Sequence, residues 1–193
     1  MIKRNISGTS LRIFWGIGAA IAAMTIGAQS AHAGGTQATD SFNTPSEWSI
    51  WKSGGAAQVT VGSTSLARTP SNAAKLFWPS GGSTSNWATV GKTFFWNQTS
   101  TGGDHPAFTG CAAGIYLKNG ASPAQGQIEL IDTIRNTYVG VKTFSLSGNS
   151  GWKWVVVSNS FECTAWLTFR VVVPNTTSVQ TVIADDLVVQ WYW

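Results

Sequence analysis

The stretch "ADDLVVQWYW" (residues 184–193) places two adjacent carboxylates, Asp185 and Asp186, before an apolar and aromatic run. Every second residue of that run is apolar or aromatic, which is the period of a β-strand with one buried face. The residues on that face are Leu187, Val189, Trp191 and Trp193. Two interpretations are open at this point: a strand that begins at an ion site, and the closing strand of an outer-membrane β-barrel.

The rest of the chain repeats this pattern in short segments, which predicts an all-β fold. Runs rich in β-branched and aromatic residues alternate with clusters of Gly, Ser, Asn and Pro. The predicted strands are Ser49–Trp51, Ala57–Val61, Ala73–Trp78, Ala88–Phe95, Ala112–Lys118, Gln127–Asp132, Tyr138–Leu146, Lys153–Val157, Ala165–Val173 and Thr181–Tyr192. Several are shorter than the roughly nine to eleven residues that a tilted membrane strand needs. The pattern therefore favours a two-sheet antiparallel β-sandwich over a small outer-membrane barrel.

The first residues have the features of a secretory signal peptide. Lys3, Arg4 and Arg12 precede an apolar run, and "AHA" at 31–33 supplies small residues at a cleavage point. A basic start, an apolar centre and a small-residue site are typical of such peptides. We expect residues 1–33 to be removed and residues 34–193 to form one secreted, extracellular domain with no membrane span. An uncleaved membrane anchor is the weaker alternative, because the apolar run is short and close to the cleavage point.

The charge of the chain gives no support to a nucleic-acid partner. The whole sequence has 12 Lys and Arg, 8 Asp and Glu, and a net charge of +4. Three of the cations belong to the predicted signal peptide, so nine cations and eight anions remain and the net charge falls to +1. The remaining cations are scattered and form no basic run, so we expect no binding to nucleic acid.

Two cysteines, Cys111 and Cys163, are the only ones in the chain. In a secreted domain, an even pair predicts a disulfide. A disulfide requires Cα atoms within about 7 Å, so this bridge would bring the predicted strands 112–118 and 165–173 close together. A zinc site is the weaker alternative, because His105 is the only histidine after residue 33 and the spacing of zinc ligands is absent.

Four segments, in chain order, resemble jelly-roll carbohydrate-binding modules of the family 4/9 type. They are "DSFNTPSEWSIW" (40–51), "HPAFTGCAAGIYLKN" (105–119), "FSLSGNSGWKWVVVSNSF" (144–161) and "LTFRVVVPNTTSVQTVIADDLVVQ" (167–190). The resemblance implies a jelly-roll β-sandwich like the galactose-binding-like domains. It does not by itself imply sugar binding, because one fold carries many functions.

The resemblance also implies one structural calcium ion near the aspartate pair. Asp185 or Asp186 would be a ligand, with Asp40 or Asn43 as a partner from the first strand. Calcium takes about six to eight oxygens from carboxylates and carbonyls. The family often has an acid where Asn43 stands, so one charge is missing here. A solvated aspartate pair at the start of a strand is the alternative interpretation.

The acidic residues do not suggest an enzyme. A glycosidase needs two carboxylates that face each other across the sugar. Glu129 and Asp132 are three residues apart on one predicted strand, which places them on opposite faces. No Gly-x-Ser-x-Gly turn is present, and Asp104 and His105 lie in a Gly- and Pro-containing loop. We expect no catalytic activity, and a glycoside-active enzyme is the weaker alternative.

The aromatic content points to carbohydrate binding. Ten of the eleven tryptophans follow residue 33, which is more than a core of this size requires. Sugars stack their C–H faces on flat aromatic rings and need fixed polar partners for their hydroxyls. On the polar faces of the central strands, we expect a poly- or oligosaccharide to contact Tyr116, Gln127, Glu129, Trp166 and Arg170. These residues form one patch only if their strands are neighbours in one sheet.

A structural or adhesive β-sandwich without sugar binding is the alternative from another functional class. Such a domain would use its aromatic faces for self-association or for a protein partner. The composition does not separate this alternative from a lectin-like module.

Overall fold

The structure is a computed structural model that describes residues 35–53, 59–79, 86–96, 108–148, 150–176 and 178–192. Within these ranges the regular secondary structure consists of strands and one short 3-10 helix, η1 (Pro45–Glu47). No helix in these ranges has the length and the apolar character needed to cross a membrane. The predicted signal peptide (1–33), the Asp104–His105 pair and Trp193 lie outside the described residues.

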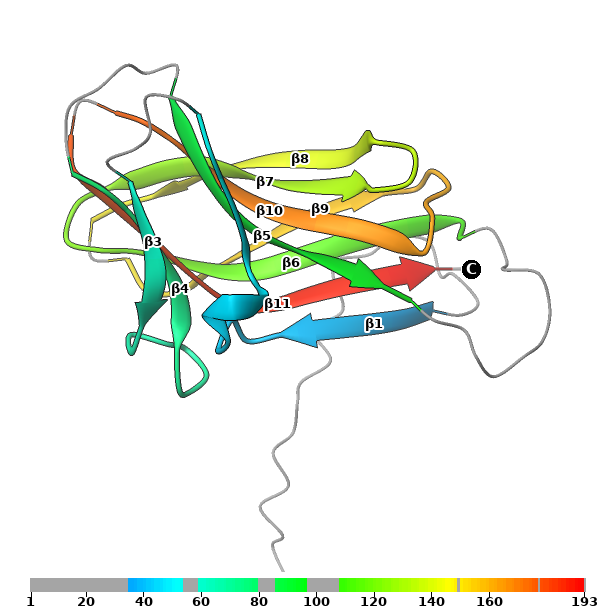
Figure 1. Ribbon diagram of the computed structural model, residues 1–193, viewed down its shortest axis with the longest axis horizontal. Coiled ribbons are helices and arrows are strands. Elements are labelled where there is room, and N and C mark those ends of the chain that lie inside the picture. The colour runs from blue at the N-terminus through cyan, green and yellow to red at the C-terminus, as the bar shows by residue number, and fades with distance from the viewer. Residues whose placement is uncertain are drawn as a thin grey trace, which may run out of the picture.

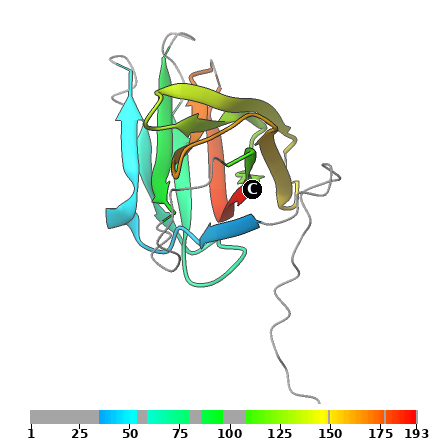
Figure 2. The same ribbon diagram turned by 90° about the vertical axis from the view of Figure 1, so that its right-hand side faces the viewer.

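Two antiparallel sheets form a β-sandwich, as the sequence predicts (Figures 1 and 2). The first sheet contains, in spatial order, β3 (Thr60–Thr64), β4 (Ala73–Trp78), β11 (Gln180–Tyr192), β6 (Gly110–Asn119) and β9 (Lys153–Asn159), and β1 (Gly35–Asp40) also pairs with β11. The second contains β2 (Ser49–Lys52), β5 (Trp87–Phe95), β10 (Trp166–Pro174), β7 (Ala124–Asp132) and β8 (Thr137–Leu146). We call them sheet A and sheet B.

The predicted strands agree closely with this architecture, with two differences. β1 was not predicted, because its sequence "GTQATD" lacks an apolar alternation. β3 begins at Thr60, and part of the predicted strand Ala57–Val61 lies outside the described residues. The central strands of both sheets match their predictions to within a few residues.

β11 is the strand on which sheet A is built. It pairs with β6 along one edge, while β4 and β1 share the other edge, β4 at residues 180–184 and β1 at residues 187–192. In Figure 1 β11 (red) lies between β6 and β1, and in Figure 2 β1 (blue) lies beside the same strand. The register along β6 shifts between Asp185 and Val188, and Asp186 has a positive φ of 50°. This β-bulge adds one residue to β11. After Ala184, the next residue that faces the core is therefore Leu187 and not residue 186.

The core lies between the sheets and takes alternate residues from each strand. In β11, Leu187, Val189 and Trp191 are buried, which confirms their predicted common face. In β10, Leu167, Phe169 and Val171 fill the core from the opposite sheet. The intervening residues of β10 therefore point away from the core, and their side chains form the outer face of sheet B.

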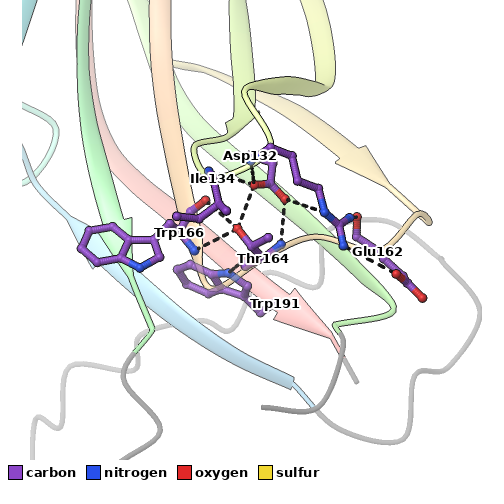
Figure 3. Close-up of polar contacts among 7 residues, drawn as sticks. Asp132, Ile134, Glu162, Thr164, Trp166 and Trp191 are labelled. Atoms are coloured by element: carbon purple, nitrogen blue, oxygen red, sulfur yellow. Dashed lines mark hydrogen bonds and ion pairs between the residues drawn. The ribbon is translucent and has the colours of Figure 1, made fainter. Parts of the chain in front are cut away.

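Asp132, at the end of β7, connects the hairpin of β7 and β8 to the segment that precedes β10 (Figure 3). Its carboxylate accepts hydrogen bonds from the backbone N–H groups of Ile134, Arg135 and Thr164 and from the Thr164 hydroxyl, at 2.8–3.1 Å. The Thr164 carbonyl accepts a hydrogen bond from the Trp191 indole at 3.2 Å. Both sheets are thereby connected through one buried carboxylate and one threonine.

Cys111 and Cys163 lie side by side as free thiols. Both are buried, and Cys163 donates its backbone N–H to the Phe108 carbonyl at 3.2 Å. A hydrogen bond with Cys163 and then burial raise the pKa of the Cys111 thiol. The disulfide between them remains a prediction, but the two residues are neighbours as it requires.

We predict that Asp132→Asn lowers the free energy of unfolding by about 2–3 kcal/mol, because an amide nitrogen would face hydrogen-bond donors in a buried site. Burial alone would raise the Asp132 pKa, but hydrogen bonds from Arg135 and Thr164 outweigh it and lower the pKa. The stabilisation is therefore present above the ordinary pKa of 3.8 and is lost as the pH falls through the lowered folded value.

Urea unfolding at pH 7 and at decreasing pH measures this effect. Glu162→Gln is the matched control, because Glu162 contacts the same Arg135 from an exposed position. Equal free energies of unfolding for the wild type and Asp132→Asn at pH 7 would contradict the structural role of Asp132.

Candidate functional site

The outer face of sheet B contains a depression of about 550 Å³. β5, β10, β7 and β8 all contribute residues to its lining. The depression exists because these strands alternate a core-facing apolar residue with an outward residue, and the outward residues include several long polar and aromatic side chains.

A cross-strand ion pair lies in the depression. Glu129 on β7 and Arg170 on β10 are directly opposite in register, and Arg170 Nη2 lies 2.8 Å from Glu129 Oε2. Glu129 Oε1 accepts a hydrogen bond from the Gln127 amide at 2.7 Å. Glu129 is only 5% exposed, although it carries a charge. The pair offsets part of the cost of burying that charge.

Two buried polar atoms in this pair have unused hydrogen-bonding capacity. Among the described residues, Arg170 Nε and Glu129 Oε2 have no hydrogen-bond partner, and Oε2 has only the ion-pair contact. Buried polar groups are nearly always hydrogen-bonded in folded proteins. A ligand hydroxyl is a group that can both donate to the carboxylate and accept from the guanidinium.

Gly91 provides the space that Arg170 occupies. The two residues are opposite in register on β5 and β10. A Cβ atom at Gly91 would lie 2.9 Å from Arg170 Cγ and 2.3 Å from the Phe169 carbonyl oxygen. The glycine therefore allows the Arg170 side chain to lie against the sheet beside Glu129.

Exposed aromatic side chains surround this polar centre. Trp51 on β2 is 37% exposed, Trp87 on β5 is 38% exposed and Tyr138 on β8 is 60% exposed. The Arg170 guanidinium carbon lies 5.7 Å from the Trp51 ring centroid, and Arg170 Nη2 donates to the Tyr138 hydroxyl at 3.4 Å. Aromatic rings thus stand on both sides of a polar floor.

A second aromatic surface lies on the same face, toward the other end of β10 and β5. Phe95 and Trp166 are directly opposite in register, and their ring centroids are 4.3 Å apart with an interplanar angle of 26°. They are 45% and 41% exposed. We call this stacked pair the Phe95–Trp166 platform.

The structure brings together most of the predicted binding residues. Gln127, Glu129 and Arg170 line the depression, and Trp166 lies on the same face of sheet B. Tyr116 does not belong to this group, so the predicted single patch is wrong in that respect. Its strand β6 is in sheet A. There the Tyr116 ring centroid lies 4.7 Å from the Trp154 ring centroid and 3.8 Å from the guanidinium carbon of Arg68. Strand alternation predicts that the Tyr116 side chain points outward, but it does not predict which sheet contains its strand.

Four aromatic contributors to the site were not among the predicted binding residues: Trp51, Trp87, Tyr138 and Phe95. Each lies at or next to an end of a predicted strand. The signal that could have found them is the alternation itself, since Tyr138 begins the strand that follows β7 through a short turn and therefore pairs with it. Trp51 required knowledge that β2 and β5 are neighbours, and Phe95 that β5 and β10 are neighbours.

The predicted calcium ligands lie at the other sheet, and their oxygens already have protein partners. Asp185 Oδ2 accepts the backbone N–H groups of Arg68 and Thr69 at 2.6 and 2.9 Å. Asp186 Oδ2 accepts the Thr69 hydroxyl at 2.8 Å and pairs with the Arg68 guanidinium. Asn43 Oδ1 accepts the N–H groups of residues 71 and 72.

Asp40 is separated from this group by its own ion pair with Lys92, which also contacts Glu47. Burial alone would lower the pKa of Lys92, but its bonds to Asp40 and Glu47 outweigh that effect and raise it. Burial raises the pKa of Asp185, and its Oδ2 already accepts two backbone N–H groups. Among the described residues, no three His, Cys, Asp or Glu side chains come together as a metal site. As they stand, these residues do not fit a calcium ion, and calcium binding remains an untested prediction.

The fold has clear counterparts among solved structures. The carbohydrate-binding module TmCBM61 in complex with β-1,4-galactotriose is 14% identical, and the match covers 77% of this chain and 89% of that chain with a TM-score of 0.51. The CBM22-1 xylan-binding domain of Paenibacillus barcinonensis Xyn10C is 11% identical, with coverages of 80% and 93% and a TM-score of 0.51. At these identities the likeness concerns the fold, and it agrees with the predicted jelly-roll β-sandwich.

A third similar structure is an enzymatically active domain, that of the bacteriophage CBA120 tailspike protein 4. It is 14% identical with a TM-score of 0.51, but the match covers only 20% of that chain and 77% of this one. No protein-family model and no curated protein matches the sequence. Among the described residues that line the depression, Glu129 is the one carboxylate, whereas a glycosidase needs two.

We predict that neither calcium nor EDTA shifts the unfolding temperature of the wild type, because the Arg68 guanidinium already neutralises Asp186.

Arg68→Ala should lower the free energy of unfolding by about 1–2 kcal/mol, through loss of this ion pair and of the contact with the Tyr116 ring. Differential scanning calorimetry measures both effects.

Lys142→Ala serves as the control, because Lys142 is an exposed cation of sheet B. A calcium-dependent rise of several degrees in the wild type, abolished by Asp185→Asn, would show that an ion displaces Arg68 and would contradict this prediction.

Proposed function

We propose that the chain is an exported, non-catalytic carbohydrate-binding domain whose ligand lies in the depression on sheet B. The observation that carries this proposal is the Glu129–Arg170 pair, whose buried atoms have unused hydrogen-bonding capacity, with exposed aromatic rings on both sides. The ligand class is an uncharged poly- or oligosaccharide.

The chemistry of a sugar matches both parts of this site. Once a small shift of the two side chains exposes these buried atoms, its hydroxyls can donate to Glu129 Oε2 beside the Arg170 contact and accept from Arg170 Nε, which uses their remaining hydrogen-bonding capacity. Its C–H faces can stack on Trp87 and Tyr138, whose rings are already exposed. An apolar ligand would leave the polar atoms with unused hydrogen-bonding capacity, and an anion would gain nothing from the negative faces of the rings.

An uncharged sugar is favoured because the charges in the depression cancel. The described lining residues include one cation, Arg170, and one anion, Glu129, and these already pair with each other. A uronic acid would have to compete with Glu129 for the guanidinium, and a protonated amino sugar would have to compete with Arg170.

The fold is compatible with carbohydrate binding, but it does not identify the function of this chain. Two of the similar structures are a module in complex with β-1,4-galactotriose and a xylan-binding domain. Because one fold carries many functions, the proposal for this chain depends on the residues of the depression.

Export and a disulfide between Cys111 and Cys163 are part of the same proposal. The signal-like segment at residues 1–33 supports export, and the adjacent buried thiols support the bridge. In an oxidising compartment, the two thiols would lose two protons and two electrons to a disulfide-bearing oxidant and form one S–S bond.

We predict that oxidised glutathione converts the purified domain to a form lighter by two hydrogens, with a free energy of unfolding raised by about 2–4 kcal/mol because the unfolded chain is constrained. Mass spectrometry and urea unfolding measure this, with Cys163→Ser as the control. Persistence of two titratable thiols in the unfolded oxidised protein would contradict the bridge.

For the binding site itself, we predict retardation of the wild type on gels that contain an uncharged polysaccharide such as xylan or β-1,4-galactan, but not on gels with polygalacturonate. Trp87→Ala and Glu129→Gln should each weaken binding about tenfold or more, by removing a stacking surface or a carboxylate oxygen that also holds Arg170 in place. Isothermal titration calorimetry gives the affinities.

Tyr116→Ala is the matched control, since it removes an aromatic ring from sheet A. It should leave sugar affinity unchanged, with the unfolding temperature of every variant measured alongside. Failure of the folded wild type to bind any of a panel of uncharged glycans would favour a structural or adhesive domain.

A further inference from the structure

We infer that the Phe95–Trp166 platform is a second contact surface for the same saccharide chain, so that the domain prefers long chains to short ones. This inference rests on the proposed function of the depression. It adds that the bound saccharide is long enough to reach both surfaces and that it runs along β10, from Arg170 toward Trp166.

The platform and the depression share one continuous face. Trp166 and Arg170 are four residues apart on β10, and residues of even spacing on a strand point to the same side. At about 3.3 Å per residue the separation is about 13 Å. A single sugar ring cannot reach from the Glu129–Arg170 pair to the Trp166 ring, whereas an oligosaccharide can.

Polar groups connect the two surfaces. Thr168 lies between Arg170 and Trp166 on β10, and its hydroxyl lies 2.8 Å from the Thr93 hydroxyl and 2.9 Å from the Thr133 hydroxyl. Thr168 itself is only 8% exposed, but Thr93 and Thr133 are exposed, and their hydroxyls can also rotate to meet those of a sugar. The strip between the surfaces thus has the groups that a saccharide chain needs.

The backbone of Trp166 is hydrogen-bonded on both its N–H and its C=O, which favours binding. The Trp166 backbone donates to Thr164 Oγ1 at 3.3 Å and accepts from the Thr133 N–H at 3.0 Å. Thr164 is held in turn by Asp132, as Figure 3 shows, and Thr133 is the next residue in the chain after Asp132. A ring whose backbone is fixed before the ligand arrives loses little conformational freedom on binding.

Cross-strand aromatic pairs also stabilise sheets, by roughly 0.2–1 kcal/mol, so exposure alone does not identify a binding surface. The two roles differ in one measurable respect. A purely structural pair affects ligands of every length equally, whereas a second contact surface affects only ligands long enough to reach it.

The experiment compares the affinity of the full chain for a series of uncharged oligosaccharides, from disaccharide to hexasaccharide, by isothermal titration calorimetry. The wild type should gain about tenfold or more in affinity once the chain reaches the platform. Trp166→Ala should remove that gain and leave the disaccharide affinity unchanged. Trp166→Phe should retain most of the gain, because it keeps an aromatic face.

Trp87→Ala separates this inference from the proposed function, since it should weaken binding at every length. A Trp166→Ala variant that loses affinity equally for short and long ligands, or that retains the full gain with length, would overturn the second surface while leaving the depression as the binding site. If the wild type binds no member of the series, the proposed function fails and the inference with it.

Discussion

The hydrogen bonding of β11 to three strands is the interaction on which sheet A depends. One edge of this strand pairs with β6, and the other is divided between β4 and β1. The division falls where the bulge at Asp185 and Asp186 adds one residue. Without the bulge, either the first or the second half of β11 would turn its apolar side chains away from the core, because a one-residue shift reverses the faces of a strand.

The aspartate pair that first suggests an ion site therefore has a structural role in this fold. Asp186 adopts the positive φ that short polar residues tolerate, and Asp185 fixes the backbone N–H groups of Arg68 and Thr69. Together they anchor the segment between β3 and β4 to the middle of β11. The cation that balances this acidic pair is the guanidinium of Arg68, supplied by the chain itself.

Sheet B shows how ordinary strand alternation produces a site. β10 places Phe169 and Val171 in the core, and the residue between them, Arg170, then faces outward opposite Glu129. The antiparallel register decides which side chains meet, and Gly91 leaves room for the arginine. Neighbouring strands add the aromatic rings on either side. The result is a buried ion pair in an open depression, with atoms that no described residue satisfies.

The sequence was sufficient for the strands and their faces, because alternation is a local property. It correctly placed Leu187, Val189 and Trp191 in the core, and the opposite orientation of Glu129 and Asp132. It could not assign strands to sheets, which depends on contacts between distant segments, and Tyr116 was therefore grouped with residues from the other sheet. The partners of Asp185 were equally out of reach, since Arg68 and Thr69 lie more than a hundred residues away along the chain.

The most direct test of the account is a two-dimensional NMR titration that follows the indole N–H signals of the tryptophans while an uncharged oligosaccharide is added. The account predicts that the signals of Trp51, Trp87 and Trp166 shift, because their rings are exposed on sheet B, while those of the buried Trp78 and Trp191 do not. Shifts confined to Trp152 and Trp154, which come from the β9 side of sheet A, would contradict it and move the binding surface to the opposite face.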